Sequence, residues 1–147
     1  MATLTGIARR EKGRAPMQTI DSVAISEQEG VQGDSRGKPG RRQVTLLSQA
    51  QWEEACRDAG AELPWTYRRA NLLVAGISFS AEMVGNTVVI GGLRMEITGE
   101  TDPCPRMDQQ HDGLTRALTP DWRGGVCCRV LKGGNVAIGD TVEIVDS

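Results

Sequence analysis

The chain of 147 residues has the length of one domain, and we expect a single domain over residues 1–147. Its composition, 39% hydrophobic and 24% charged residues, fits a globular protein and excludes collagen-like, coiled-coil and disordered chains. The 17 Lys and Arg residues are balanced by 19 Asp and Glu, and a net charge of −2 argues against a general nucleic-acid binder.

Two β-prone segments come first along the chain, Leu4–Arg9 and Gln43–Leu47, and the second leads into the clearest helix, Ser48–Ala59. Ser48 and Gln51 form an S-x-x-Q capping box at its start, and the glycine after Ala59 predicts a left-handed stop. Apolar residues recur at i, i+3, i+4 and i+7 and give the helix one buried face, formed by Trp52, Ala55, Cys56 and Ala59. The cysteine of this face is therefore expected to pack and to carry no chemistry.

Most of the remaining patterns indicate strands. In chain order they are expected at Asn71–Ala75, Thr87–Ile90, Leu93–Ile97, Val126–Leu131 and Thr141–Val145. Gly91-Gly92 between the second and third of these is a hairpin signal, and Gly133-Gly134 joins the last two. Many short strands, frequent glycines and one good helix predict a β-rich α+β fold, a β-barrel with a few short appended helices.

The termini and the cysteines bear on the compartment. The N-terminal residues lack the apolar stretch of a secretory signal, and no apolar run is long enough to span a bilayer. The four cysteines match neither a C-x-x-C redox pair nor the paired spacings of zinc sites, and adjacent Cys127 and Cys128 are most simply explained by packing on two faces of a strand. We expect reduced thiols and a cytoplasmic protein that does not associate with membranes.

The segment Gly33–Arg42 is rich in glycine and in basic residues. It is not a P-loop, because the spacing of its glycines is wrong, Pro39 stands where Ser or Thr is needed, and a strand follows instead of a helix. A glycine-rich loop can still approach an anionic ligand closely, and this one carries Arg36, Lys38, Arg41 and Arg42. The alternative is a solvated, mobile basic loop.

Cys104 lies between two prolines in the sequence Pro103-Cys104-Pro105-Arg106. A cysteine framed in this way cannot occupy a helix interior, and Arg106 favours the thiolate, which is the form that attacks and binds metals. We therefore expect a functional thiol at Cys104, with an inert loop thiol as the alternative.

Two further polar positions are candidates for a site. Arg69 and Asn71 point to the same face if a strand has already begun there, which places a guanidinium beside an amide. His111 is the only histidine, and it is interpreted as a polar surface residue. The sequence does not decide whether Asp108 or His111 could shuttle protons.

Six short segments, taken in order, resemble the MOSC domain, which is named after the C-terminal domain of molybdenum cofactor sulfurases. The resemblance is to the small stand-alone bacterial type and extends over nearly the whole chain. The segments are EGVQGD (29–34), RRANL (68–72), VGNTV (84–88), PCPR (103–106), GVCCRVL (125–131) and IGDTV (138–142).

The resemblance implies a β-barrel and a central functional cysteine, which matches Cys104. In that family the cysteine carries a persulfide or ligates molybdenum in the pterin cofactor. Arg69 and Asn71 match the family's R-x-N segment near the cofactor, and Arg36 and Arg106 are expected contacts to phosphate or pterin. A thiolate suits a thiophilic metal, and arginines suit the cofactor's phosphate.

The implied activity is a molybdenum-dependent reduction of N-hydroxylated small molecules, in which Cys104 is the metal ligand. The chain shows no ferredoxin-type cysteine set and no dinucleotide fingerprint, so a separate redox partner is expected. Pyridoxal phosphate is not expected, since the chain has no room for the aminotransferase-like domain of the full-length sulfurases. The alternative is a sulfur carrier or cofactor-delivery module that holds a persulfide on Cys104 without turnover and is served by a cysteine desulfurase.

Overall fold

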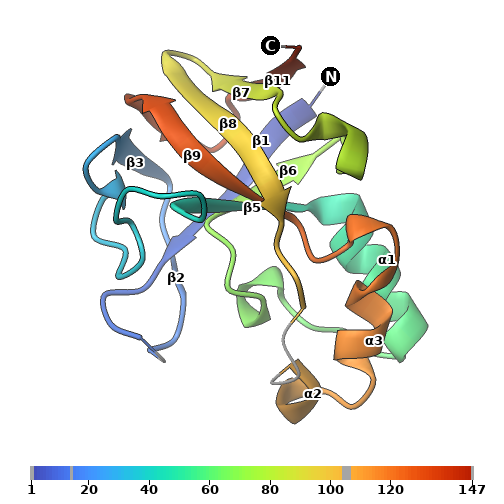
Figure 1. Ribbon diagram of the computed structural model, residues 1–147. Coiled ribbons are helices and arrows are strands. Elements are labelled where there is room, and N and C mark those ends of the chain that lie inside the picture. The colour runs from blue at the N-terminus through green and yellow to red at the C-terminus, as the bar shows by residue number, and fades with distance from the viewer. Residues whose placement is uncertain (1, 14, 104–106, 147) are drawn as a thin grey trace.

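The computed structural model describes residues 2–13, 15–103 and 107–146, and its main feature is a closed β-barrel (Figure 1). Within these residues seven strands close the barrel in the order β11-β7-β8-β9-β5-β6-β1, and β1 pairs back to β11. The β5–β6 pairing is parallel and the other barrel pairings are antiparallel. The strands are β1 (Ala2–Arg9), β5 (Val44–Ser48), β6 (Leu72–Ala75), β7 (Thr87–Ile90), β8 (Leu93–Glu100), β9 (Val126–Lys132) and β11 (Thr141–Val145). The barrel expected from the sequence is confirmed.

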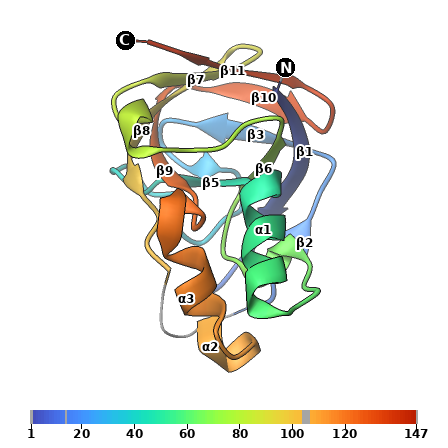
Figure 2. The same cartoon turned by 90° about the vertical axis from the view of Figure 1, so that its right-hand side faces the viewer.

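Smaller elements surround the barrel. The end of β1 pairs with β2 (Gln18–Thr19), and a separate three-stranded sheet contains β10 (Gly134–Ala137), β3 (Ser22–Ser26) and β4 (Gly30–Val31). Three short α-helices lie together at one end of the barrel (Figure 2). They are α1 (Gln49–Ala59), α2 (Met107–Gln110) and α3 (Leu114–Leu118), and single 3₁₀ turns occur at η1 (Trp65–Tyr67), η2 (Ala81–Met83) and η3 (Pro120–Trp122). Among the described residues, no helix is long and apolar enough to cross a membrane.

The barrel interior is filled by alternating strand residues. In β8, Leu93, Met95 and Ile97 are fully buried while Arg94 is exposed, as the two-residue periodicity of the sequence predicts. The β7–β8 hairpin closes with Ile90 opposite Leu93, so the Gly-Gly turn is also confirmed. Cys128 of β9 lies in this core, so its interpretation as a packing residue holds.

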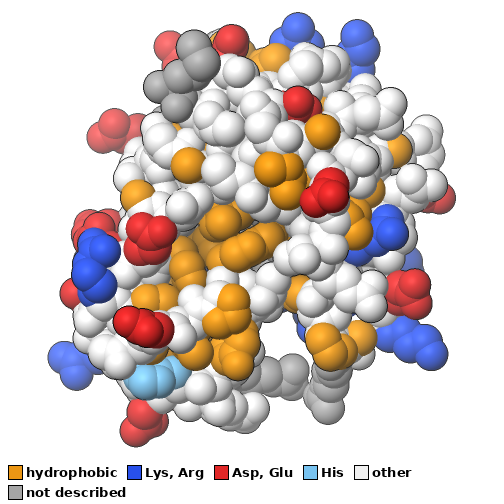
Figure 3. Space-filling model, turned by 180° about the vertical axis from the view of Figure 1, so that it is seen from behind, with side chains coloured by type: hydrophobic (Ala, Val, Ile, Leu, Met, Phe, Trp, Pro, Cys, Tyr) orange, Lys and Arg blue, Asp and Glu red, His pale blue; other side chains and the backbone are white. Residues whose placement is uncertain are grey.

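A second apolar cluster attaches the helices to the barrel. Trp52, Ala55 and Cys56 of α1 pack with Leu114 and Leu118 of α3, and the cysteine of the predicted apolar face is indeed buried. Seen from behind, apolar side chains also gather in a hollow near the centre of that face, with charged side chains mostly around it (Figure 3).

The start of α1 differs in part from the sequence prediction. The Ser48 Oγ accepts a hydrogen bond from the Gln51 backbone N–H at 3.2 Å, and Gly60 ends the helix in a left-handed conformation, as expected. The Gln51 side chain does not return to Ser48. It instead bonds to both the backbone N–H and C=O of Phe79, at 2.9 and 3.1 Å, and donates to the Asp121 carbonyl at 2.8 Å. The capping box is therefore half formed, because a glutamine used to connect loops is not available to the cap.

The basic segment 33–42 is held against the barrel by a close backbone approach. A Cβ added at Gly37 would lie 1.6 Å from the Glu29 carbonyl oxygen, so only a glycine fits there. The Gln43 side-chain amide reinforces this contact, since it donates to the carbonyls of Glu27 and Gly37 at 2.8 and 3.1 Å and accepts from the Val130 N–H at 3.0 Å. The segment is thus a fixed wall, which favours the ligand-approach interpretation over a mobile loop.

We expect Gly37→Ala to lower the free energy of unfolding by about 1–3 kcal/mol, because the new methyl group must push the loop away from the Glu29 carbonyl. Gly92→Ala is the matched control, since nothing lies within 4 Å of its added Cβ. The measurement is urea denaturation of both variants. Equal midpoints for the two would show that the close approach at Gly37 does not stabilise the fold.

Candidate functional site

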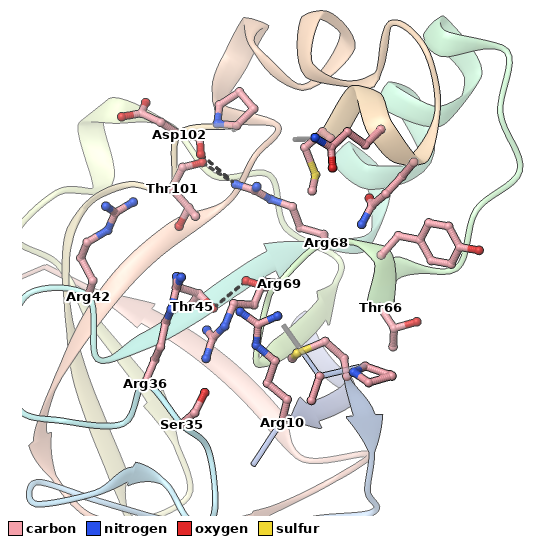
Figure 4. Close-up of a pocket in the computed structure, with 18 of the residues that line it drawn as sticks. Arg10, Ser35, Arg36, Arg42, Thr45, Thr66, Arg68, Arg69, Thr101 and Asp102 are labelled. Carbon is pink, nitrogen blue, oxygen red and sulfur yellow. Dashed lines mark hydrogen bonds between the residues drawn. The ribbon is translucent and has the colours of Figure 1, made fainter. Parts of the chain in front are cut away.

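A large cavity of about 1380 Å³ opens between the barrel and the helical end, and its described lining is strongly cationic (Figure 4). The wall formed by segment 33–42 contributes part of the lining, and the rest comes from the chain after β1, the residues before β6, the end of β8 and α2. The ionisable side chains among the described lining residues are six cations, Arg10, Arg36, Lys38, Arg42, Arg68 and Arg69, together with the carboxylate of Asp102 and the phenol of Tyr67.

One buried carboxylate, Asp34, organises the arginines of this cavity. Its Oδ2 forms an ion pair with Arg69 Nη2 at 3.0 Å, and its Oδ1 accepts from the Arg10 backbone N–H at 3.1 Å. The Arg36 backbone N–H lies 3.4 Å from the Oδ2, and only 1% of the Asp34 side chain is exposed. Asp34 therefore joins the residue after β1, segment 33–42 and the residues before β6 at one point.

The arginines around Asp34 repel one another. Burial, followed by the positive charges of Arg69 and Arg36, lowers the pKa of the Arg10 guanidinium. Burial also lowers the pKa of Arg69; Asp34 opposes this effect, and Arg36 adds to it. A single carboxylate cannot neutralise three guanidinium groups, so this part of the cavity keeps a net positive charge.

Two nitrogen atoms in the same cluster lack partners. The Nε atoms of Arg10 and Arg69 are buried, and within the described residues neither has a hydrogen-bond acceptor. Buried donors that lack an acceptor are costly, and such groups are commonly satisfied by a ligand, an ion or water. Together with the excess charge, they indicate a site for an anionic ligand.

Two of the site residues predicted from the sequence line the cavity. Arg36 and Arg69 both line the cavity, and the ion pair of Arg69 with Asp34 fixes its orientation. Cys104 and Arg106 lie outside the described residues, so their predicted roles stay predictions. The described residues on either side of them, Pro103 and Met107, both line the cavity.

Asn71 differs from the expectation that it shares a face with Arg69. Strand β6 begins only at Leu72, and Asn71 is not among the described residues that line the cavity. Its side-chain oxygen accepts from the backbone N–H and the hydroxyl of Thr45, at 3.0 and 3.2 Å, and its amide donates to the Ala8 carbonyl at 3.2 Å. With 1% of the residue exposed, this amide joins β5 to β1 behind the arginines.

The two candidate proton shuttles have other partners. His111 lies at the surface, where it is half-buried, and its Nε2 lies 2.9 Å from the Ala59 carbonyl at the end of α1. Asp108 accepts from the Thr115 backbone N–H at 2.9 Å. Neither is among the described lining residues, whereas Asp102 is.

The structure also adds residues that sequence reasoning missed. Arg10, Arg68 and Asp102 line the cavity, although no role was predicted for them, and contacts between distant segments bring them together. Basic runs at residues 9–14 and 67–69 are the one signal that could have drawn attention to the arginines.

The cysteines outside the 104–106 segment do not take part in this cavity. Cys56, Cys127 and Cys128 are free and buried, and burial raises the pKa of the Cys56 and Cys128 thiols. In the part of the chain that the structure describes, no group of three or more His, Cys, Asp or Glu residues could hold a metal ion.

The fold has counterparts among solved structures, and the sequence matches a known family. A family model described as the MOSC domain matches residues 28–143. The crystal structure of the YuaD protein from Bacillus subtilis resembles the chain with a TM-score of 0.85 at 19% identity, over 100% of this chain and 97% of that chain. YiiM from Escherichia coli and YiiM from Geobacillus stearothermophilus give TM-scores of 0.73 and 0.69 at 14% and 16% identity. Each covers 99% of this chain, and the matches cover 70% and 73% of those two chains. No curated protein sequence matches the chain.

We expect Asn71→Ala to lower the free energy of unfolding by about 1–3 kcal/mol, because it removes the acceptor of the buried Thr45 N–H. Asn135→Ala is the control, since that asparagine is exposed. Urea denaturation gives the difference. An unchanged midpoint in Asn71→Ala, combined with loss of a bound ligand, would instead assign Asn71 to ligand contact.

The pH dependence of stability should show the effect of Glu100. Burial, and then the neighbouring negative charge of Asp102, raise the pKa of the Glu100 carboxyl. The folded state therefore prefers the neutral form, and ionisation of Glu100 as the pH rises costs stability. In urea denaturation at pH 7, Glu100→Gln should have a higher free energy of unfolding than wild type. The difference between the two should become smaller near about pH 4, where both side chains are neutral. Glu143→Gln, which removes an exposed carboxylate, reports the background effect. The same difference in free energy of unfolding at both pH values would contradict this account.

Proposed function

The chain belongs to the MOSC domain family, and we propose that its cationic cavity binds a molybdenum-pterin cofactor and that the loaded protein reduces N-hydroxylated small molecules. The observation that carries the proposal is the cluster of Arg10, Arg36 and Arg69 around Asp34, which keeps a net positive charge in a cavity of about 1380 Å³. That volume is ample for a bicyclic or tricyclic ligand, since ligand pockets commonly measure roughly 300–1,000 Å³.

The described residues fit the anionic part of this cofactor. The buried Nε atoms of Arg10 and Arg69 need acceptors, and the oxygen atoms of a phosphate supply them. Arg36 adds a third positive charge beside them, and the rigid wall around Gly37 keeps that arginine at the cavity. We assign these three arginines to the cofactor's phosphate. Asn71 does not contact the cofactor in this assignment; it holds β5 and β1 together behind the arginines.

The metal end of the cofactor is assigned to Cys104. Its thiolate is a soft ligand that suits a thiophilic metal, and the neighbouring Pro103 and Met107 line the same cavity. When bound, the cofactor supplies oxygen-atom transfer. Reduction of an N-hydroxyl group to an amine and water consumes two electrons and two protons. The electrons require a separate redox partner, and Asp102 is the carboxylate among the described lining residues that we assign to proton relay.

Molybdenum and pterin content per chain tests the assignment of Cys104. In protein from a host that makes the cofactor, we expect near-stoichiometric metal in wild type and loss of most of it in Cys104→Ala, because the metal loses its thiolate ligand. Cys56→Ala is the matched control, since Cys56 is buried in the helical cluster and should leave the metal in place. Absence of metal from wild type, under conditions that load a related protein, would contradict the proposal.

Turnover and mass spectrometry then separate the enzyme from a sulfur carrier. The loaded protein should reduce a hydroxylaminopurine when a competent electron donor is present. A carrier would show no such turnover and would instead gain about 32 Da, one sulfur atom, on Cys104 after incubation with a cysteine desulfurase. Loaded protein that is inactive with a competent donor would refute the reductase activity.

A further inference from the structure

We propose that Lys38 and Arg42 form an outer phosphate subsite in the exposed part of the cavity, and that this subsite takes the phosphate of a phosphorylated substrate. Both residues are exposed and line the cavity. The preferred N-hydroxylated compounds are then phosphate esters, such as nucleotides, and not the uncharged bases. The assignment to a substrate rests on the proposed function, whereas the presence of an anion subsite does not.

Arg42 lies between two residues whose side chains are anchored elsewhere. On one side, Arg41 Nη2 donates to the Thr98 carbonyl at 3.1 Å, and the Arg41 carbonyl accepts from the Thr98 hydroxyl. On the other side, the buried Gln43 side chain accepts from the Val130 N–H at 3.0 Å. The backbone at Arg42 is therefore fixed against β8 and β9, and its own side chain is the one that faces the cavity.

Lys38 is carried by an equally fixed stretch of backbone. It follows Gly37, which packs so closely on the Glu29 carbonyl that no side chain fits there. The Gly37 carbonyl also accepts from the Gln43 amide at 3.1 Å. Both cations are thus presented by the rigid wall, which lowers the entropy cost of holding a ligand between them.

The charges in the cavity leave both cations available when the cofactor is bound. The excess positive charge of the arginines around Asp34 is matched by a phosphate monoester, which carries about −1.5 to −2 at pH 7. Among the described residues, neither Lys38 nor Arg42 has an ion pair. The carboxylate of Asp102 is too little to balance Lys38, Arg42 and Arg68 together. A ligand with a phosphate of its own supplies the missing negative charge.

The outer pair is separate from the inner arginines. In Figure 4 the Arg42 guanidinium lies apart from those of Arg10 and Arg69, with Arg36 between them in this view. The neighbouring charges that shift the pKa of Arg10 and of Arg69 all belong to the inner cluster around Asp34. Two phosphates can therefore be held at once, one by each group of cations.

Acetylation of lysines in the metal-free full chain tests the outer subsite, with adenosine 5′-monophosphate as the probe. Peptide mass spectrometry gives a separate rate for Lys38 and for Lys132, which is exposed at the end of β9 and serves as the internal control. The nucleotide should slow acetylation of Lys38 about fivefold, because a neighbouring phosphate favours the protonated ammonium, which does not react. The rate at Lys132 should not change, and adenosine, which lacks the phosphate, should protect neither lysine.

Arg42→Gln distinguishes the outer subsite from the inner cluster. Protection of Lys38 by the nucleotide should be lost in this variant, because the outer phosphate loses its guanidinium. Arg57→Gln removes an exposed arginine of α1 that does not line the cavity, and it should keep the protection. Equal protection of Lys38 in wild type and Arg42→Gln would assign the nucleotide to the inner cluster and overturn the proposal. So would an unchanged Lys38 rate in wild type.

The same reaction on cofactor-loaded protein identifies the source of the outer phosphate. If the substrate supplies it, loading alone leaves the Lys38 rate unchanged and the nucleotide still slows it. Slower acetylation on loading alone would assign the subsite to a second phosphate of the cofactor and overturn the assignment to a substrate.

Steady-state kinetics of the loaded protein complete the test. In Arg42→Gln, the KM for a hydroxylaminopurine nucleotide should rise about tenfold with kcat unchanged, because a charge-assisted contact to the phosphate is lost. The KM for the free base should stay the same, and an unchanged KM for the nucleotide would overturn the assignment to a substrate. The acetylation of metal-free protein does not depend on molybdenum content, so failure of the cofactor proposal and failure of the outer subsite can be told apart.

Discussion

The cavity depends on one buried carboxylate. Asp34 is almost inaccessible to solvent, and it links the end of β1, the basic wall and the residues before β6 through Arg10, Arg36 and Arg69. Without that negative charge, the partly buried guanidinium groups of Arg10 and Arg69 would give up hydration and repel each other and Arg36 with no compensating partner. With it, the repulsion is offset only in part. The remaining charge is held in place by the fold and is available to a ligand.

The parts of the fold that follow local patterns could be predicted from the sequence. The β7–β8 hairpin and helix α1 were predicted because alternation, a Gly-Gly turn and a serine cap are signals within a few residues. A few short helices were predicted, but the positions of α2 and α3 were not, since they are only four and five residues long and are held by burial of Met107, Leu114 and Leu118 in the cluster around α1. The capping box was also predicted only in part, because the Gln51 side chain forms hydrogen bonds with loops that are distant in the sequence.

The candidate site could be predicted only where a motif marks it. Arg36 and Arg69 lie in segments that the sequence singles out, and both line the cavity, whereas Arg10 belongs to it only through contacts with residues far away in the sequence. Asn71 shows the limit of motif reasoning, because it stands two residues from Arg69 but serves the strands behind the cavity. Cys104, the residue with the strongest chemical signal in the sequence, stays a prediction.

The pairing of β1 with β11 has a consequence for the time course of folding. Ala2 lies opposite Val142, so the barrel cannot close until nearly the whole described chain has left the ribosome. Contacts between residues so far apart carry a large loop-closure entropy and slow the folding of single domains. Until β11 arrives, the free edges of β1 and β7 are open to pairing with other chains, so the nascent protein passes through a period of aggregation risk that the finished barrel no longer has.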